Sequence, residues 1–412
     1  MKRLQTAFIQ TLLQLSKPFY AFLFAFVFYL IFSTLAGSPF RVREFAYFNY
    51  LADAFLHGQL NLRVIPPLTH DLSFFDGKYY LYWPPMPAVV LMPFVAVFGV
   101  GFSDVLFTIL VASVNVSLLA KLLQEADAKK LLELDSEYRA MLVLFFALGT
   151  VHATLAPFGG VWFTAQILGF LFVLLAYLAA IKLEGIPAFI TTGVLIACAM
   201  LTRNHLIFTG IWPVFYLLQK HWKQKHLFLN ALCLFLPILA MGLLFLAYNQ
   251  IRFGSPLELG MKYHQMSPFF IEDYNKYGAF NIHYIPINFY YQYIYYPFPL
   301  SAENLIGGSL FLLSPVLFYA FRGLKLGYRN PNIVMWLISI LFTSLPIFLL
   351  MGTGWVQFGP RYTLDYTVPL LLLTAFGVQA ISKRFLFFLV ILSILQYLPG
   401  IIILSQYQGT IR

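Results

Sequence analysis

Apolar segments of membrane length follow one another along almost the whole chain. A helix needs about 20 apolar residues to cross the hydrocarbon core of a bilayer. By this criterion we predict about eleven spans, near residues 19–36, 103–122, 140–156, 164–182, 187–202, 206–219, 227–248, 303–321, 332–351, 364–381 and 385–404. A helix satisfies its own backbone hydrogen bonds in lipid, and no regular strand-length alternation predicts a transmembrane barrel. The sequence therefore predicts an all-α polytopic membrane protein, with residues 1–412 as one transmembrane domain.

The composition agrees with this class. Hydrophobic residues make up 60% of the chain and charged residues 10%, whereas soluble domains carry about 25% charged residues. Residues 86–100 form a shorter apolar piece that follows several prolines, and we predict an interfacial or re-entrant segment there. Cys198 and Cys233 both lie in apolar segments, so we expect buried thiols and neither a disulfide framework nor a metal cluster.

The positive charges predict the orientation of the chain in the membrane. The net charge is +10, and the basic residues gather in short loops at Lys2–Arg3, Lys129–Lys130, Lys220–His226, Arg322–Arg329 and Lys383–Arg384. Short basic loops lie on the cytoplasmic side of membrane proteins, so we predict a cytoplasmic N-terminus and an uncleaved first helix. This distribution argues against nucleic-acid binding. The opposite face then receives two long loops, residues 37–102 and 249–302.

The first long loop concentrates acidic residues between two predicted spans. Residues 43–58 have helical periodicity, with apolar positions at Phe48, Leu51, Ala52, Phe55 and Leu56 on one face. This pattern predicts an amphipathic helix that lies flat on the membrane surface and stops at Gly58. Glu44 would stand at the start of that helix and Asp53 on its polar side. A carboxylate at a helix start is also a common partner of the helix dipole, so a structural role for Glu44 stays open.

Several motifs of this chain resemble one family of membrane enzymes. They are Leu51-Ala52-Asp53-Ala54-Phe55-Leu56-His57-Gly58, Asp76-Gly77-Lys78-Tyr79-Tyr80 before Pro84-Pro85-Met86-Pro87, Tyr248–Pro256, and Gln357-Phe358-Gly359-Pro360-Arg361-Tyr362 before Asp365. Their order resembles that of the GT-C glycosyltransferases, which include the protein O-mannosyltransferases and the aminoarabinose transferases. Counting back from Ala52 and Gly58, Glu44 stands at the position of the family's catalytic Asp. The family's second acid is replaced by Phe45 here.

The resemblance implies a reaction and a place for it. The implied enzyme takes a sugar from a polyprenyl-phosphate donor and transfers it, with inversion, to a glycan, lipid or protein acceptor. It works among membrane lipids at the outer face of a bacterial cytoplasmic membrane. Glu44 would be the general base that deprotonates the acceptor hydroxyl, with Asp53 as the second choice. Some members use a divalent ion, for which His57, His70 and Asp71 are available, but their spacing is not a recognised ligand pattern and we predict no metal or other cofactor.

Basic residues near the outer ends of predicted spans are candidates for binding the donor phosphate. Arg203 and Arg361 would lie near the headgroup level, and helix anchoring is an equally good explanation for their position. The predicted substrate-binding set comprises Arg203, His205, Lys262, His264, Arg361 and Tyr362. We expect Asp365 to form an ion pair with Arg361, four residues earlier. The many aromatic residues of the second long loop favour a membrane-interface belt over sugar stacking.

A non-enzymatic flippase or transporter of lipid-linked sugars is the alternative from another class. It predicts functional charge near the membrane midplane, whereas most polar candidates here lie in outer loops or at the ends of spans. A lipid-binding subunit of a larger assembly is a third possibility.

Overall fold

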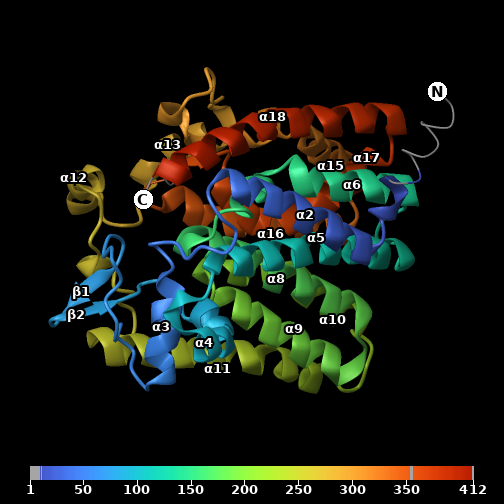
Figure 1. Ribbon diagram of the computed structural model, residues 1–412. Helices are drawn as coiled ribbons and strands as arrows, with labels where there is room; N and C mark the ends of the chain where they lie inside the picture. The colour runs from blue at the N-terminus through green and yellow to red at the C-terminus, as the bar shows by residue number, and fades with distance from the viewer. Residues whose placement is uncertain (1–9, 11, 353–355, 411–412) are drawn as a thin grey trace.

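The computed structural model describes residues 10, 12–352 and 356–410 of the chain; Lys2 and Arg3 lie outside this part. Most helices run side by side in one bundle (Figure 1). Seven apolar helical segments of the described part are long enough to cross a membrane. They are α2 (Pro18–Leu35), α5 (Asp104–Ala128), α6 (Ser136–Leu148) with α7 (Val151–Leu155), α8 (Gly160–Lys182), α11 (Leu227–Phe253), α16 (Pro331–Leu349) and α18 (Lys383–Thr410). The prediction of an all-α membrane protein is confirmed at this level.

The other four predicted spans are shorter or broken helices. They correspond to α9 (Gly185–Met200), to η2 (Asn204–Gly210) with α10 (Ile211–Lys220), to α14 (Leu310–Leu313), η7 (Pro315–Phe318) and α15 (Tyr319–Gly327), and to η8 (Arg361–Tyr366) with α17 (Thr367–Val378). A single helix over 303–321 was wrong, because the chain there forms strand β3 (Ile306–Gly307) and restarts at Pro315. Strand β3 pairs in parallel with β4 (Gln357–Phe358).

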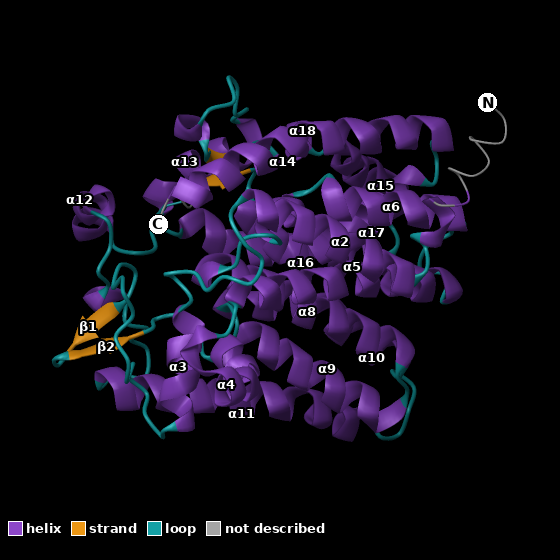
Figure 2. Ribbon diagram, viewed as in Figure 1, coloured by secondary structure: helices purple, strands orange, loops and turns teal. Residues whose placement is uncertain are grey.

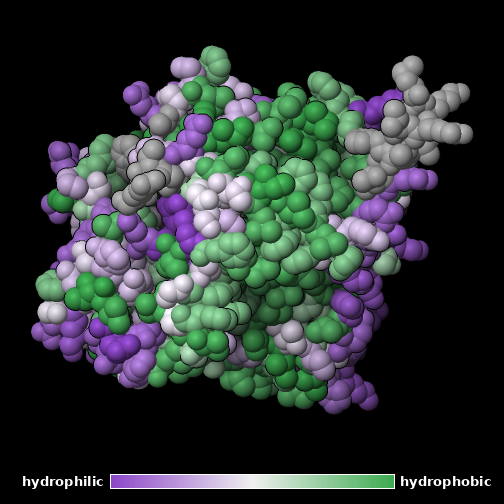
Figure 3. All heavy atoms as spheres, in the orientation of Figure 1, coloured by the Kyte–Doolittle hydropathy of each residue, from purple (hydrophilic) through white to green (hydrophobic). Residues whose placement is uncertain are grey.

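The centre of the bundle is formed by α5, α6 to α7, and α8. Between 67% and 89% of their most apolar windows is buried inside the protein, against 11% for α11 and 28% for α2. Figure 3 shows hydrophobic residues over the middle of the bundle and hydrophilic residues gathered at its two ends. This distribution fits a protein whose outer helices face lipid along most of their length.

Helices α15 and α17 approach each other more closely than side chains would allow. A Cβ atom on Gly377 would overlap the carbonyl oxygen of Tyr319, and one on Gly323 would overlap that of Leu373. Small residues permit such contact between helix backbones in membranes. The short α17 is therefore packed closely against α15 at these two glycines.

The predicted amphipathic helix of the first long loop is present but differs in two respects. Helix α3 (Tyr47–Leu56) begins three residues after Glu44, which lies in a turn. Seven of its ten residues are buried, and it packs on α4 (Met86–Phe98), so its apolar face meets protein and does not lie on the membrane surface. The predicted stop is confirmed: Gly58 has φ +69° and its N–H donates to the carbonyl of Phe55.

The two long loops meet at one end of the bundle. The first carries the hairpin β1 (Ser73–Phe75) and β2 (Lys78–Tyr80), which Figure 2 shows on the same side of the bundle as α12 (Pro268–Tyr277) of the second loop. The second loop also contains η3 (Met261–Tyr263) before α12, and after it η4 (Ile282–Tyr284), α13 (Ile285–Phe289) and the π-helix η5 (Tyr290–Ile294). The N–H of Asp71 donates to the carbonyl of Gln265 (3.0 Å), and the N–H of Gln265 donates to that of Leu72 (2.8 Å). This pair of backbone hydrogen bonds joins the loops.

Candidate functional site

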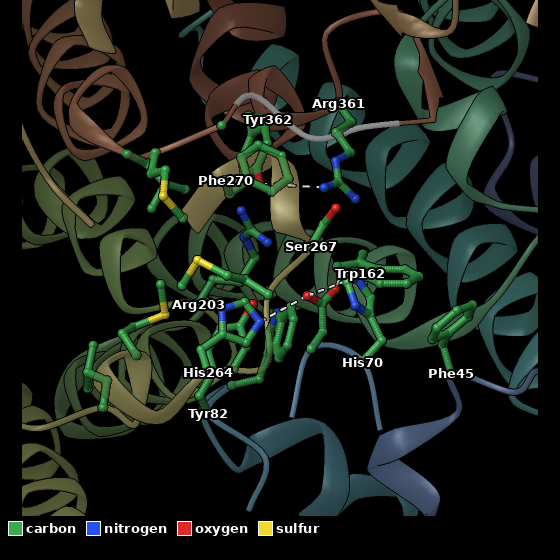
Figure 4. Close-up of a pocket in the computed structure, with 18 of the residues that line it drawn as sticks. Phe45, His70, Tyr82, Trp162, Arg203, His264, Ser267, Phe270, Arg361 and Tyr362 are labelled. Atoms are coloured by element: carbon green, nitrogen blue, oxygen red, sulfur yellow. Dashed lines mark hydrogen bonds and ion pairs between the residues drawn. The ribbon is translucent and has the colours of Figure 1, made fainter. Parts of the chain in front are cut away.

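A cavity of about 650 Å³ lies where the two long loops meet the ends of α8, η2 and η8. Aromatic side chains, among them Tyr82, Trp162 and Tyr362, form much of its wall (Figure 4). Its charged and ionisable residues, apart from tyrosine, are Arg43, His70, Asp71, Arg203, His205, His264 and Arg361. Among the described residues that line it, Asp71 is the one acid. The cavity thus combines an apolar wall with three arginines, three histidines and, among the described residues, a single carboxylate.

Asp71 is held in a defined position by hydrogen-bond donors from α8 and from the second long loop. Its Oδ1 accepts a hydrogen bond from Nε2 of His264 (2.9 Å), and its Oδ2 accepts one from Nε1 of Trp162 at the start of α8 (3.0 Å). Nε2 of His70 lies 3.4 Å from Oδ1. The backbone of Asp71 has φ +64°, which few residues other than glycine adopt. Such conformations persist where the surroundings impose them and are common at functional sites.

Arg361 is buried without a counter-ion. Only 7% of the residue is exposed, and no carboxylate among the described residues lies within 4.0 Å of its guanidinium. Its Nη2 is 3.5 Å from the hydroxyl oxygen of Tyr362, while its Nε has no hydrogen-bond partner. The guanidinium also lies 5.8 Å from the ring centre of Phe163. A buried charge is costly unless it is paired, so this guanidinium is chemically suited to binding an anion.

The predicted ion pair between Asp365 and Arg361 was wrong. Oδ2 of Asp365 accepts hydrogen bonds from Nε of Arg203 (3.1 Å) and from Nε2 of His205 (2.7 Å). The reason lies in the local helix type: η8 is a 3-10 helix. With three residues per turn, positions four apart do not share a face as they do in an α-helix. Asp365 therefore neutralises Arg203, and Arg361 remains available for a ligand.

Arg43 adds a cationic side chain to the cavity, although the sequence did not single it out. Its backbone N–H donates to Oδ1 of Asp104 (2.9 Å), and Oδ2 of the same carboxylate accepts from the N–H of Gly160 (2.6 Å). Burial, and then the neighbouring Arg41, lower the pKa of Arg43 to about 10, so it stays cationic at neutral pH. Asp104 thus fixes Arg43 and the start of α8, which carries Trp162, relative to each other.

The two predicted catalytic acids do not line the cavity. Glu44 is half-buried in the turn before α3. Asp53 is 8% exposed and accepts two hydrogen bonds from Arg63, at 3.0 and 2.9 Å, while Nδ1 of His57 lies 3.6 Å from its Oδ1. A carboxylate in a bidentate ion pair with arginine has both oxygens occupied, which suits a structural role better than proton transfer.

The cavity unites most of the predicted substrate-binding set. Arg203, His205, His264, Arg361 and Tyr362 line it, whereas Lys262 is exposed and does not. Figure 4 shows the side chains of Arg203 and Arg361 directed into the same space as His264 and Trp162. From the sequence alone, Asp71 is a candidate only as a metal ligand. No local pattern predicts its left-handed backbone conformation, and its hydrogen-bond donors lie far away in the chain.

Metal ligands do not converge in the described part of the chain. No group of three or more His, Cys, Asp or Glu side chains there has an arrangement that could hold a metal ion. His57 lies against Asp53, whereas His70 and Asp71 line the cavity, so these three residues do not form one ligand set.

Comparison with known proteins adds no relative. No protein-family model matches this chain, and no curated protein sequence matches it.

Proposed function

We propose that this chain is an integral membrane glycosyltransferase. It would transfer a sugar from a polyprenyl-phosphate donor to a glycan, lipid or protein acceptor, with inversion at the anomeric carbon. The resemblance of its motifs to GT-C enzymes supports the reaction class. The basic loops at the end of the bundle opposite the cavity support a cytoplasmic N-terminus and a cavity on the outer face. The bacterial cytoplasmic membrane is implied by the resemblance, and about eleven passes are implied by the hydropathy of the chain.

The observation that carries the proposal is that Asp71 and the unpaired guanidinium of Arg361 line the same cavity among the described residues. Transfer of a sugar from a lipid phosphate needs a base for the acceptor hydroxyl and positive charge for the departing phosphate. The acceptor oxygen bonds to the anomeric carbon as its proton passes to a carboxylate. The bond between that carbon and the phosphate oxygen breaks, and the phosphate leaves with the electron pair. Arg361, which has no counter-ion among the described residues, would bind that phosphate.

Asp71 suits the role of base better than Glu44. Each of its oxygens accepts one hydrogen bond, from His264 or from Trp162, so each keeps a further acceptor site. The same two donors fix its orientation toward a substrate, which favours catalysis because the geometry is set in advance. Glu44 is not among the residues that line the cavity.

The flippase alternative receives less support. It predicts charged groups distributed toward the middle of the membrane. The charged cavity residues instead come from the two long loops and from the adjoining ends of helices at one end of the bundle.

The decisive experiment measures sugar transfer from a radiolabelled polyprenyl-phosphate donor in membranes. It compares the wild type with Asp71→Asn, Glu44→Gln and Asp53→Asn at matched expression. Loss of a general base costs about 10²–10⁴-fold, so we expect a loss of that size for Asp71→Asn and a much smaller one for Glu44→Gln. Asp53→Asn serves as the structural control, with a lower unfolding temperature.

Two outcomes would count against the proposal. Full activity of Asp71→Asn together with loss in Glu44→Gln would return the base to Glu44. No transfer by the wild type over a broad donor and acceptor panel, with lipid-linked sugar still crossing proteoliposomes, would favour the flippase.

A further inference from the structure

Three connections between helices converge at the end of the bundle opposite the cavity. Lys129 follows α5, Glu184 lies between α8 and α9, and Lys220 ends α10. Oε1 of Glu184 lies 2.6 Å from Nζ of Lys220 and 3.8 Å from Nζ of Lys129. This carboxylate therefore brings lysines from two separate connections together.

The lysines around Glu184 carry more positive charge than this one carboxylate can neutralise. Lys223 and Lys225 follow directly in the connection to α11, and both are exposed. No carboxylate of the described residues lies within 4.0 Å of either amine. We call Lys129, Glu184, Lys220, Lys223 and Lys225 the basic patch; its four lysines and one glutamate give a net charge of +3.

A second charged cluster at the same end is neutralised by its own carboxylates. Nζ of Lys383 lies 2.5 Å from Oδ2 of Asp135 and 3.1 Å from Oε2 of Glu137. Nη1 of Arg139 lies 2.8 Å from Oδ2 of Asp127. Two cations there meet three carboxylates, so that cluster has no positive charge to offer a ligand.

Large apolar side chains adjoin the basic patch. Trp222 is 71% exposed within the lysine-rich connection, and Phe228, at the start of α11, is 82% exposed. Helix α11 is the least buried of the long apolar helices. Figure 3 shows hydrophilic residues at this end beside the hydrophobic middle of the bundle. Tryptophan prefers the headgroup level of a bilayer, and lysine near that level attracts anionic lipids.

We propose that the basic patch binds the headgroup of an anionic phospholipid, whose acyl chains lie along the exposed face of α11. The lysines supply the charge for the phosphate, and Trp222 and Phe228 meet the boundary between headgroup and acyl chains. These apolar neighbours distinguish a lipid from a free phosphate ion, which would gain nothing from them. The inference does not depend on the reaction proposed for the cavity.

Native mass spectrometry of the full chain in neutral detergent tests the proposal with phosphatidylglycerol and phosphatidylcholine as probes. A basic residue near an anionic surface contributes about 1 kcal/mol, so the double variant Lys223→Gln/Lys225→Gln should bind phosphatidylglycerol about 30-fold more weakly. Lys383→Gln is the matched control at the same end, and we expect less than about a twofold change because that lysine is already neutralised.

The result that would overturn the proposal is equally direct. Equal binding of the two lipids by the wild type, or unchanged phosphatidylglycerol binding by the double variant, would exclude the site. Displacement of the lipid by inorganic phosphate at equal concentration would show a free-anion site and reject the lipid. Both changed lysines are exposed, so an unaltered unfolding temperature of the double variant verifies that the fold is intact.

Discussion

Replacing Arg361 with methionine should separate the stability of the protein from its activity. The side chain is 7% exposed, its Nε lacks a hydrogen bond, and no carboxylate of the described residues balances its charge. An uncompensated buried charge costs several kcal/mol. The guanidinium carbon lies 5.0 Å from the ring centre of Tyr362 and 5.8 Å from that of Phe163. Each of these cation–π contacts offsets about 0.5–2 kcal/mol of that cost. The empty protein should therefore unfold at the same temperature or a higher one after Arg361→Met.

Activity should respond in the opposite direction. Two hydrogen bonds from the guanidinium to a phosphate are worth about 1.5–3 kcal/mol each, together about 3–6 kcal/mol. Since 1.36 kcal/mol corresponds to a factor of ten, kcat/KM for the lipid-phosphate donor should fall about 10²–10⁴-fold. Both quantities can be measured on one preparation, by thermal unfolding in detergent and by sugar transfer.

Arg252→Met is the matched control for this experiment. Arg252 is also buried, but its Nη1 donates to the carbonyl of Leu81 (2.8 Å) and its Nη2 to Oδ1 of Asn249 (2.7 Å). Its loss leaves buried acceptors unsatisfied at about 1–3 kcal/mol each, so this variant should unfold at a lower temperature. Equal destabilisation of Arg361→Met and Arg252→Met, or a kcat/KM of Arg361→Met within about threefold of the wild type, would contradict the role assigned to Arg361.

Two further substitutions test packing, one beside the cavity and one between α15 and α17. Asp104→Asn should lower the unfolding temperature and impair transfer, because an amide cannot accept from the N–H groups of both Arg43 and Gly160, and an orphaned buried N–H costs about 1–3 kcal/mol. An unchanged unfolding temperature would contradict this role. Gly377→Leu should destabilise the protein by about 1–3 kcal/mol or more, since the new side chain overlaps the backbone of α15. Gly242→Leu on α11 meets open space and should leave the unfolding temperature unchanged; equal effects of the two would refute the close contact.

The structural class of this protein could be predicted from its sequence, because hydropathy and helix formation in lipid depend on local sequence. An apolar run must become a helix in lipid because it has to satisfy its own backbone groups, and seven such segments are found in the described residues. The end of α3 could also be predicted from local sequence, since Gly58 adopts the left-handed conformation that terminates a helix. The broken segment at 303–321 was not predicted, because hydropathy alone does not register the pairing of β3 with β4 from far along the chain.

The composition of the cavity was decided by tertiary structure. The sequence predicted five lining residues correctly, because residues near the ends of apolar segments and in long loops lie at the membrane surface. They are Arg203, His205, His264, Arg361 and Tyr362. It could not select Asp71 over Glu44. The donors to Asp71 come from α8 and from the second long loop, so its role exists only after the two loops have joined. Chain position determines which residues reach one end of the bundle, whereas packing between distant segments determines which carboxylate faces the cavity and which arginine is left without a counter-ion.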